Sequence, residues 1–135
     1  MIVIDASAVI ELLLRTKRGE KVEARALTPD EQMHAPHLLD VEITQVLRRL
    51  VQLKEISPLR GQQALDDYVA LNIKRATHVD LLPRMWDLRE SITAYDAAYV
   101  AFAEALDAPL VTCDGKLARS HGHRVKIELI VDDTD

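Results

Sequence analysis

The chain has 135 residues and a formal net charge of −5, which excludes a protein that coats nucleic acid through a general basic field. With 48% hydrophobic residues and no linker, internal repeat or low-complexity stretch, it can build one hydrophobic core, so we expect a single domain over residues 1–135. No apolar run is long enough to span a bilayer, no signal peptide opens the chain and one cysteine cannot form an internal disulfide, so we expect no membrane association and a cytoplasmic location.

The first third of the chain begins with a short apolar run and continues with helical patterns. Residues 1–4 are mostly β-branched and predict a central parallel strand that is buried on both faces. Ser7 can cap a helix over about residues 8–14, and a second short helix is expected over 20–27. Residues 33–35 form a weak strand candidate. A longer helix follows Pro36, because its apolar residues recur at helical spacing.

The rest of the chain repeats this alternation of helices and strands. A helix is expected after Ser57-Pro58, where serine caps and proline takes the first helical position. The later elements are then, in chain order, a strand over 76–79, helices over 81–89 and 94–106, and strands over 110–112 and 126–131. Strands that alternate with helices predict an α/β fold with a mainly parallel sheet and right-handed crossovers.

Two aspartates directly follow apolar strands of this expected sheet. Asp5 comes after the first strand and Asp114 comes after the strand over 110–112. In open α/β sheets, ligands bind beyond the carboxyl ends of the strands. The two carboxylates are therefore expected at the same edge, as near neighbours if their strands are adjacent.

Two further acids lie on the apolar faces of helices. Glu42 shares a face with Leu39 and Val46, and Asp96 shares one with Val100. Burying an unpaired carboxylate is costly, and no lysine or arginine stands at matching helical spacing on these faces. One divalent cation would neutralise all the acids at once.

The ligand chemistry of this set indicates a hard cation. Oxygen ligands from aspartate and glutamate suit Mg²⁺ or Mn²⁺, which keep several waters and contact substrate phosphate. Such an ion can polarise a phosphoryl oxygen and orient a water, so the chemistry expected is phosphodiester hydrolysis.

Helix capping is the alternative interpretation of each acid taken alone. Asp96 follows Thr93 at the spacing of a capping box, Asp114 can cap the turn that it begins with Gly115, and Glu42 lies within two turns of Pro36. Acidic residues favour helix N-termini in any protein. Four acids at two strand ends and on two apolar helix faces favour the metal site.

Four motifs in fixed order resemble the PIN-domain nucleases and, among them, the VapC-type toxins of bacterial toxin–antitoxin modules. They are residues 2–8, 39–44, 92–101 and 110–118, and the resemblance extends over nearly the whole chain. It implies a three-layer α/β/α sandwich and an endoribonuclease that depends on Mg²⁺, with Mn²⁺ as a substitute. It also implies a homodimer, an RNA substrate and a small cognate antitoxin protein that blocks the active site.

The resemblance also assigns roles to residues. Asp5, Glu42, Asp96 and Asp114 would surround the metal, with Asp5 and Asp96 as direct ligands and the other two able to act through water. The hydroxyls of Ser7 and Thr112 would orient carboxylates or ordered water, although a helix cap and an ordinary strand residue are their alternatives. A metal-activated water would attack the phosphorus in line with the leaving ribose oxygen, without a covalent enzyme intermediate.

Basic residues near the acids are candidates for holding the RNA backbone, because an acidic pocket alone repels RNA. The candidates are Arg15, Lys17, Arg18, Lys116 and Arg119. A solvated charged face is the alternative for each of them.

Other functions fit the same acids less well. A phosphatase of the haloacid-dehalogenase type needs an Asp-x-Asp nucleophile motif, and this chain has Asp5-Ala6-Ser7. A receiver-like signalling domain needs paired acids in the first strand and a late strand-end lysine, and neither is evident. A housekeeping RNA-processing nuclease of the PIN type, without a toxin role, stays open, as does a degenerate binding module, which the presence of all four acids disfavours.

Overall fold

A five-stranded parallel sheet forms the centre of the fold in the computed structural model, which describes residues 1–133. The strands stand in the order β3-β2-β1-β4-β5, and every neighbouring pair is parallel. Their bounds are β1 Ile2–Ile4, β2 Met33–Pro36, β3 Ile73–Ala76, β4 Leu110–Thr112 and β5 Ile127–Leu129.

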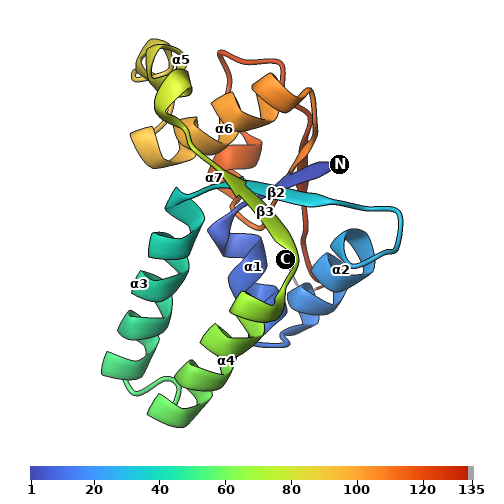
Figure 1. The fold of residues 1–135 in the computed structure, drawn as a ribbon, viewed down its shortest axis with the longest axis vertical. Helices are drawn as coiled ribbons and strands as arrows, with labels where there is room; N and C mark the ends of the chain where they lie inside the picture. Colours follow the sequence, from blue (N-terminus) through green and yellow to red (C-terminus); the bar gives the residue numbers. More distant parts are fainter. Residues whose placement is uncertain (134–135) are drawn as a thin grey trace.

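Helices cover both faces of this sheet and make the α/β/α sandwich that the sequence predicts. They are α1 Ala6–Leu13, α2 Lys17–Ala26, α3 Leu38–Gln52, α4 Pro58–Ala70, α5 Leu82–Asp87, α6 Ala94–Leu106 and α7 Gly115–Ala118, with a 3₁₀ turn, η1, at Val79–Leu81. Right-handed crossovers explain the layers, because the chain moves one way along the sheet through β3 and returns the other way to β4 and β5. Figure 1 shows α1 to α4 gathered on one side of the sheet and α5 and α6 on the other.

The buried core is built around β1 and α6. Ile2, Val3 and Ile4 have no exposed surface, because β1 is the middle strand and is covered on both faces. Residues 97–103 of α6 are buried without interruption, and four of these seven are alanines, which let the helix pack closely on β1, β2 and β4. Burial of these apolar residues is the main stabilising term of the fold.

The strand order reverses between β1 and β4. From β1 the chain proceeds to β2 on one side, and it later returns to β4 on the other side of β1, with Val3 opposite Leu110 and Ile4 opposite Val111. Such a reversal opens a crevice beyond the carboxyl ends of the two strands, and this is where open α/β sheets bind ligands.

Several expected boundaries move in the structure. Asp5, and not Ser7, caps α1, since its carboxylate accepts a hydrogen bond from the Ala8 amide at 3.1 Å. The second helix begins at Lys17 because Thr16 caps it, three residues before the expected start. The strand expected over 76–79 is β3, at Ile73–Ala76. The four-residue helix α7 was not predicted.

The position of β3 explains why it was misplaced. It is an edge strand, and its charged residues Lys74 and Arg75 interrupt the apolar run that would mark a buried strand. No helix within residues 1–133 combines the length and the apolar character that crossing a membrane requires.

Candidate metal and active site

Asp5 and Asp114 both lie at the edge of the sheet beyond β1 and β4, because the two strands are neighbours. The two strands pair directly, and the Asp5 amide donates a hydrogen bond to the Val111 carbonyl at 3.2 Å. Each aspartate lies shortly after its strand and caps the helix that follows. Asp5 caps α1, and Asp114 caps α7. The fold therefore places both carboxylates where two helices begin.

Three donors fix the carboxylate of Asp5, which is only 6% exposed. Ser7 Oγ and the Ala8 amide donate to Oδ1 at 2.7 and 3.1 Å, and Thr112 Oγ1 donates to Oδ2 at 2.5 Å. The orientation of this carboxylate is thus set by β4 as well as by its own helix.

The hydroxyls of Ser7 and Thr112 also order the chain after β4. Ser7 Oγ accepts a hydrogen bond from the Cys113 amide at 2.9 Å, and Thr112 Oγ1 accepts one from the Asp114 amide at 3.0 Å. The two hydroxyl oxygens are 3.2 Å apart. Both residues therefore connect Asp5 with the segment that carries Asp114, whereas neither one caps a helix.

Glu42 and Asp96 approach the crevice from two different helices. Glu42 projects from α3, and its Oε1 accepts a hydrogen bond from the hydroxyl of Tyr99 on α6 at 2.5 Å. Asp96 lies in the first turn of α6, where its amide donates to Thr93 Oγ1 at 3.2 Å. Both side chains are half-buried.

The pKa values of Asp5, Glu42 and Asp96 are all raised, mainly by burial and further by a neighbouring acid. Burial raises the pKa of Asp5 from 3.8 to about 6, its three hydrogen bonds oppose the rise, and the charge of Asp96 adds to it. Burial and then the charge of Asp96 raise the pKa of Glu42, against the hydrogen bond from Tyr99. Burial and the charge of Asp114 raise the pKa of Asp96, against its hydrogen bond with Thr93. Asp96 is thus coupled to each of the other three acids.

The tyrosine beside Glu42 stays protonated at every physiological pH. Burial, followed by the hydrogen bond to Glu42, raises the pKa of Tyr99 above the usual range of a phenol. Its hydroxyl is therefore a permanent donor to the carboxylate.

No arginine or lysine neutralises this cluster. Within residues 1–133, none of the four acids has an ion pair with a basic side chain, although ion pairs are found elsewhere on the protein. Over the same residues, no three His, Cys, Asp or Glu side chains stand close enough to form a ligand group for one ion by themselves. The donors are all oxygens and their charges are uncompensated, which fits a hard divalent cation that completes its shell with water.

Lys116 and Arg119 lie beside the acids. They line one pocket together with Asp96, and Arg119 folds against the start of α7, where its Nη1 is 3.0 Å from the position of a Cβ on Gly115. The same pocket contains Arg89, which stacks on the Trp86 ring at 4.8 Å and which is not among the RNA-backbone candidates predicted from the sequence. Its only signal in the sequence is a basic residue shortly before Asp96.

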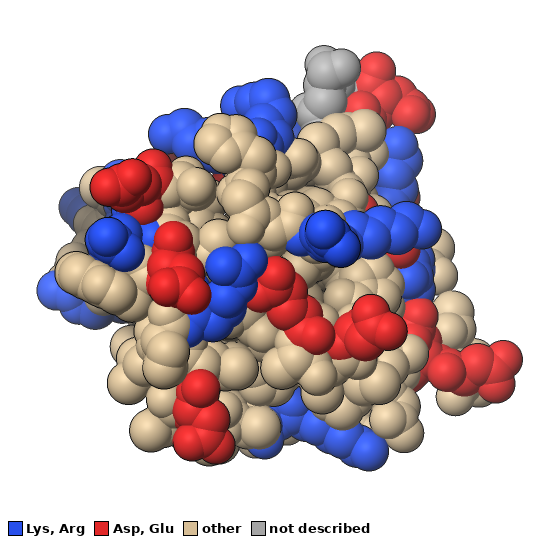
Figure 2. All heavy atoms as spheres, turned by 90° about the horizontal axis from the view of Figure 1, so that it is seen from above, with Lys and Arg blue, Asp and Glu red and all other residues tan. Residues whose placement is uncertain are grey.

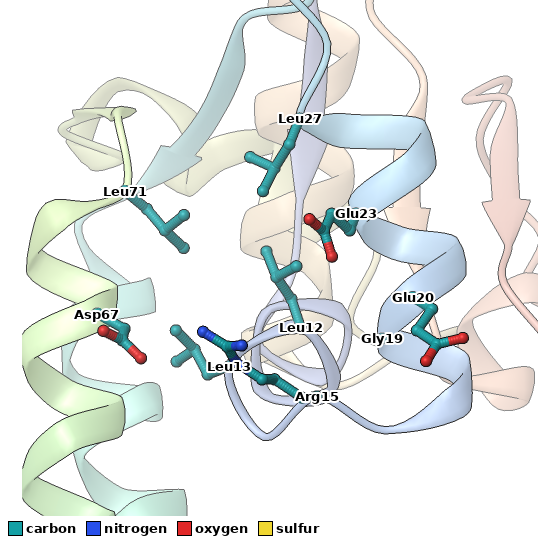
Figure 3. A pocket seen from close by; sticks show the side chains of 9 residues that line it. All are labelled: Leu12, Leu13, Arg15, Gly19, Glu20, Glu23, Leu27, Asp67 and Leu71. Carbon is teal, nitrogen blue, oxygen red and sulfur yellow. The ribbon is translucent and has the colours of Figure 1, made fainter.

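Arg15, Lys17 and Arg18 lie at the opposite end of α1 from Asp5. The eight residues of α1 separate them from the acids by ~12 Å along the helix axis. Arg15 lines a different pocket, between α4 and the α1–α2 hairpin, together with leucines and three acids (Figure 3). Arg18 forms an ion pair with Glu11 at 3.5 Å. This position does not favour direct contact with a phosphate held at Asp5.

Comparison with known proteins agrees with this architecture. The PIN domain family model matches residues 2–121. Ribonuclease VapC12 of Mycobacterium tuberculosis is 44% identical over 130 residues, which cover 96% of this chain and 99% of the relative.

Solved structures share the fold at lower sequence identity. VapBC2 from Rickettsia felis, bound to a DNA fragment from its promoter, superposes with a TM-score of 0.70 at 15% identity, over 96% of this chain and 98% of that one. A toxin-antitoxin complex from Klebsiella pneumoniae gives 0.63 at 14% identity, over 98% and 99%. The family model and the close relative together show that the chain belongs to the PIN domain family, in the group of the VapC ribonucleases.

Proposed function

We propose that the protein is a metal-dependent endoribonuclease that acts as the toxin of a toxin–antitoxin pair. The observation that carries the proposal is the uncompensated cluster of Asp5, Glu42, Asp96 and Asp114, whose charges are coupled through Asp96. The relative at 44% identity is named a ribonuclease. The four acids would hold Mg²⁺, with Mn²⁺ as a substitute.

A bound divalent ion would polarise the scissile phosphate and lower the pKa of a coordinated water, which supplies the nucleophile. The residues of the chain hold the groups around it. Hydrogen bonds from Ser7, Thr112 and the Ala8 amide fix the orientation of the Asp5 carboxylate. This carboxylate would therefore not need to reorient during the reaction. Half-burial of Glu42 and Asp96 limits water around the phosphate and strengthens electrostatic interactions there.

The pocket beside Asp96 is the proposed path of the RNA backbone. It brings Lys116, Arg119 and Arg89 next to one of the acids, so cationic side chains can bind phosphates on either side of the cleaved bond. Figure 2 shows acidic and basic side chains interspersed over the face seen from above, with no continuous basic field on that face. RNA binding is therefore expected to concentrate near the acids.

Cleavage of RNA in the presence and absence of metal tests the activity. We expect the purified protein to cleave RNA with Mg²⁺ or Mn²⁺ and to lose that activity in excess chelator. Asp96→Asn should reduce kcat by at least ~10²-fold while the far-ultraviolet circular dichroism stays that of the wild type. Equal cleavage by the wild type with and without chelator would exclude the metal mechanism.

Lys116 and Lys17 form a matched pair of lysines for testing the backbone path. Both side chains are exposed, but only Lys116 lines the pocket of Asp96. We expect Lys116→Ala to raise KM for RNA about threefold to tenfold and to weaken its dependence on salt, because a phosphate contact is lost. Lys17→Ala should leave KM within twofold of the wild type. Equal effects of the two variants would contradict the proposed path.

A cognate antitoxin and a second copy of the chain are the proposed protein partners, in the cytoplasm where the RNA substrate is found. A solved structure of similar fold is a toxin-antitoxin complex. For the homodimer, the exposed side chains of Val79, Leu82 and Trp86 lie along one side of η1 and α5, next to Arg89 of the RNA pocket. Trp86→Ala should shift the protein toward monomer in light scattering, and an unchanged mass would exclude this surface as the dimer contact.

A further inference from the structure

Two tyrosines make equivalent hydrogen bonds to acids of α3. Tyr99 donates to Glu42 at 2.5 Å from α6, and Tyr68 donates to Asp40 from α4. Glu42 belongs to the acidic cluster, whereas Asp40 is also paired with Arg75 at 2.9 Å. The Tyr99–Glu42 pair is therefore at the proposed metal site. The Tyr68–Asp40 pair lies outside that site, where Arg75 neutralises Asp40.

Tyr99 is rigidly held. It is 2% exposed in the core, so its ring has no freedom to follow a moving partner. On α6 it stands three residues after Asp96, and residues at this spacing share a helix face. The same face of α6 thus carries one acid of the cluster and the hydroxyl that binds another.

Glu42 needs such a contact more than the aspartates do. Its side chain has one more rotatable bond than aspartate, and it projects from the second turn of α3 and not from a helix cap. Asp5, by comparison, is fixed by three donors from its own helix and from β4. Tyr99 is the hydrogen-bond donor that the structure gives to Glu42.

We propose that Tyr99 is a positioning residue, which holds Glu42 through Oε1 and leaves Oε2 available to the metal site. The inference rests on the proposed metal-dependent function and deepens it, because it explains how Glu42 of α3 is aligned with α6, 57 residues further along the chain at Tyr99. Tyr99 touches neither RNA nor metal and acts only through Glu42.

Calorimetric titration with Mn²⁺ tests this assignment directly. Tyr99→Phe removes only the hydroxyl, and we expect it to weaken Mn²⁺ binding about tenfold, which is the usual cost of losing a partner of a metal-ligating side chain. Tyr68→Phe is the matched control, because it removes the same group from a buried tyrosine bonded to the same helix. The control should stay within twofold of the wild type in Mn²⁺ affinity.

A double-mutant cycle separates positioning from a general loss of stability. In Glu42→Ala the hydroxyl of Tyr99 has lost its acceptor, so adding Tyr99→Phe should leave the remaining Mn²⁺ affinity unchanged. In RNA cleavage, Tyr99→Phe should lower kcat about tenfold with KM for RNA little changed.

The outcomes are distinguishable. The inference is wrong if Tyr99→Phe and Tyr68→Phe have equal Mn²⁺ affinities, or if the loss caused by Tyr99→Phe persists in Glu42→Ala. If the wild type binds Mn²⁺ but cleaves no RNA, the proposed function fails while the titrations still decide the role of Tyr99. A wild type that binds no Mn²⁺ would overturn both.

Discussion

Asp5 follows β1, caps α1 and is the most deeply buried of the four acids. Asp114 caps α7 and lies at the same edge of the sheet as Asp5. Asp96 lies in the first turn of α6. Helix N-termini carry partial positive charge, which offsets part of the repulsion among three of the four acids. Burial, and after it the charge of a neighbouring acid, raises the pKa values of Asp5, Glu42 and Asp96. A bound cation would offset both effects.

The pKa of Asp5, raised mainly by burial, predicts a pH-dependent stability of the metal-free protein. Asp5 has a pKa of about 6 in the folded chain against an ordinary value of 3.8, so the folded state binds more protons between these values. Its contribution to stability is fully present below pH 3.8 and is lost as pH rises through about 6. The shift corresponds to at most ~3 kcal/mol.

Comparison of the wild type with Asp5→Asn isolates this contribution. In chelator, the free energy of unfolding of Asp5→Asn relative to the wild type should increase as pH rises from 4 to 7, measured by urea unfolding at each pH. At pH 7 and saturating Mn²⁺, the wild type should instead be more stable than Asp5→Asn, because only the wild type retains the full metal site. A difference that is independent of pH would mean that the Asp5 carboxylate keeps its ordinary pKa.

Thr112 should matter through its hydroxyl alone. Thr112→Val keeps the β-branched shape of the side chain. It removes the hydroxyl that donates a hydrogen bond to Asp5 and that accepts one from the Asp114 amide. We expect a loss of ~1–3 kcal/mol in stability and a weaker Mn²⁺ affinity. Thr44→Val removes an exposed hydroxyl that only donates to the Asp40 carbonyl, and it should change neither quantity. Equal behaviour of the two variants in Mn²⁺ binding would show that the hydroxyl does not support the site.

At the scale of elements, the site depends on how closely α1 packs on α2. Gly19 allows this approach, because a Cβ built there would lie 2.0 Å from the Glu11 carbonyl oxygen. Since Asp5 caps α1, a shift of α1 relative to α2 would also displace Asp5. No flexible side chain can move aside, as the contact is to backbone.

Gly19→Ala should therefore destabilise the protein by ~3 kcal/mol or more. At Gly115, the first residue of α7, the nearest atom to a new Cβ is the flexible Arg119 guanidinium, so Gly115→Ala should cost less than ~1 kcal/mol. Thermal unfolding of both variants checks the difference. A mild effect at Gly19 would show that α1 and α2 separate easily.

The same elements show what the sequence can predict and what it cannot. The buried strand β1, the acids after β1 and β4 and the long apolar stripe of α3 follow from local pattern, and the structure confirms these elements. Edge strand β3 and the short helix α7 depend on pairing and capping that no apolar periodicity records. Capping of α1 by Asp5 in place of Ser7 does not follow from local pattern, because both residues are good caps. The Asp5 carboxylate is also held by Thr112, more than one hundred residues away.

At the scale of the whole molecule, the strand order decides which distant residues meet. The reversal between β1 and β4 joins Asp5 to Asp114, and the crossovers on opposite faces bring α3 and α6 to the same edge. Lys116 and Arg119 lie in the pocket of Asp96, whereas Arg15, equally basic and close to Asp5 in sequence, lies at the far end of α1. Sequence distance to an acid therefore does not predict which cations surround it.

One titration tests most directly the central claim that acids from four separate segments form a single metal site. We expect the wild type to bind Mn²⁺ in calorimetry at pH 7, and Asp5→Asn, Glu42→Gln, Asp96→Asn and Asp114→Asn each to weaken that binding by at least tenfold. Asp66→Asn, which alters an exposed acid of α4, should bind as the wild type does. Undiminished Mn²⁺ binding by the Asp5 and Asp96 variants would contradict the claim.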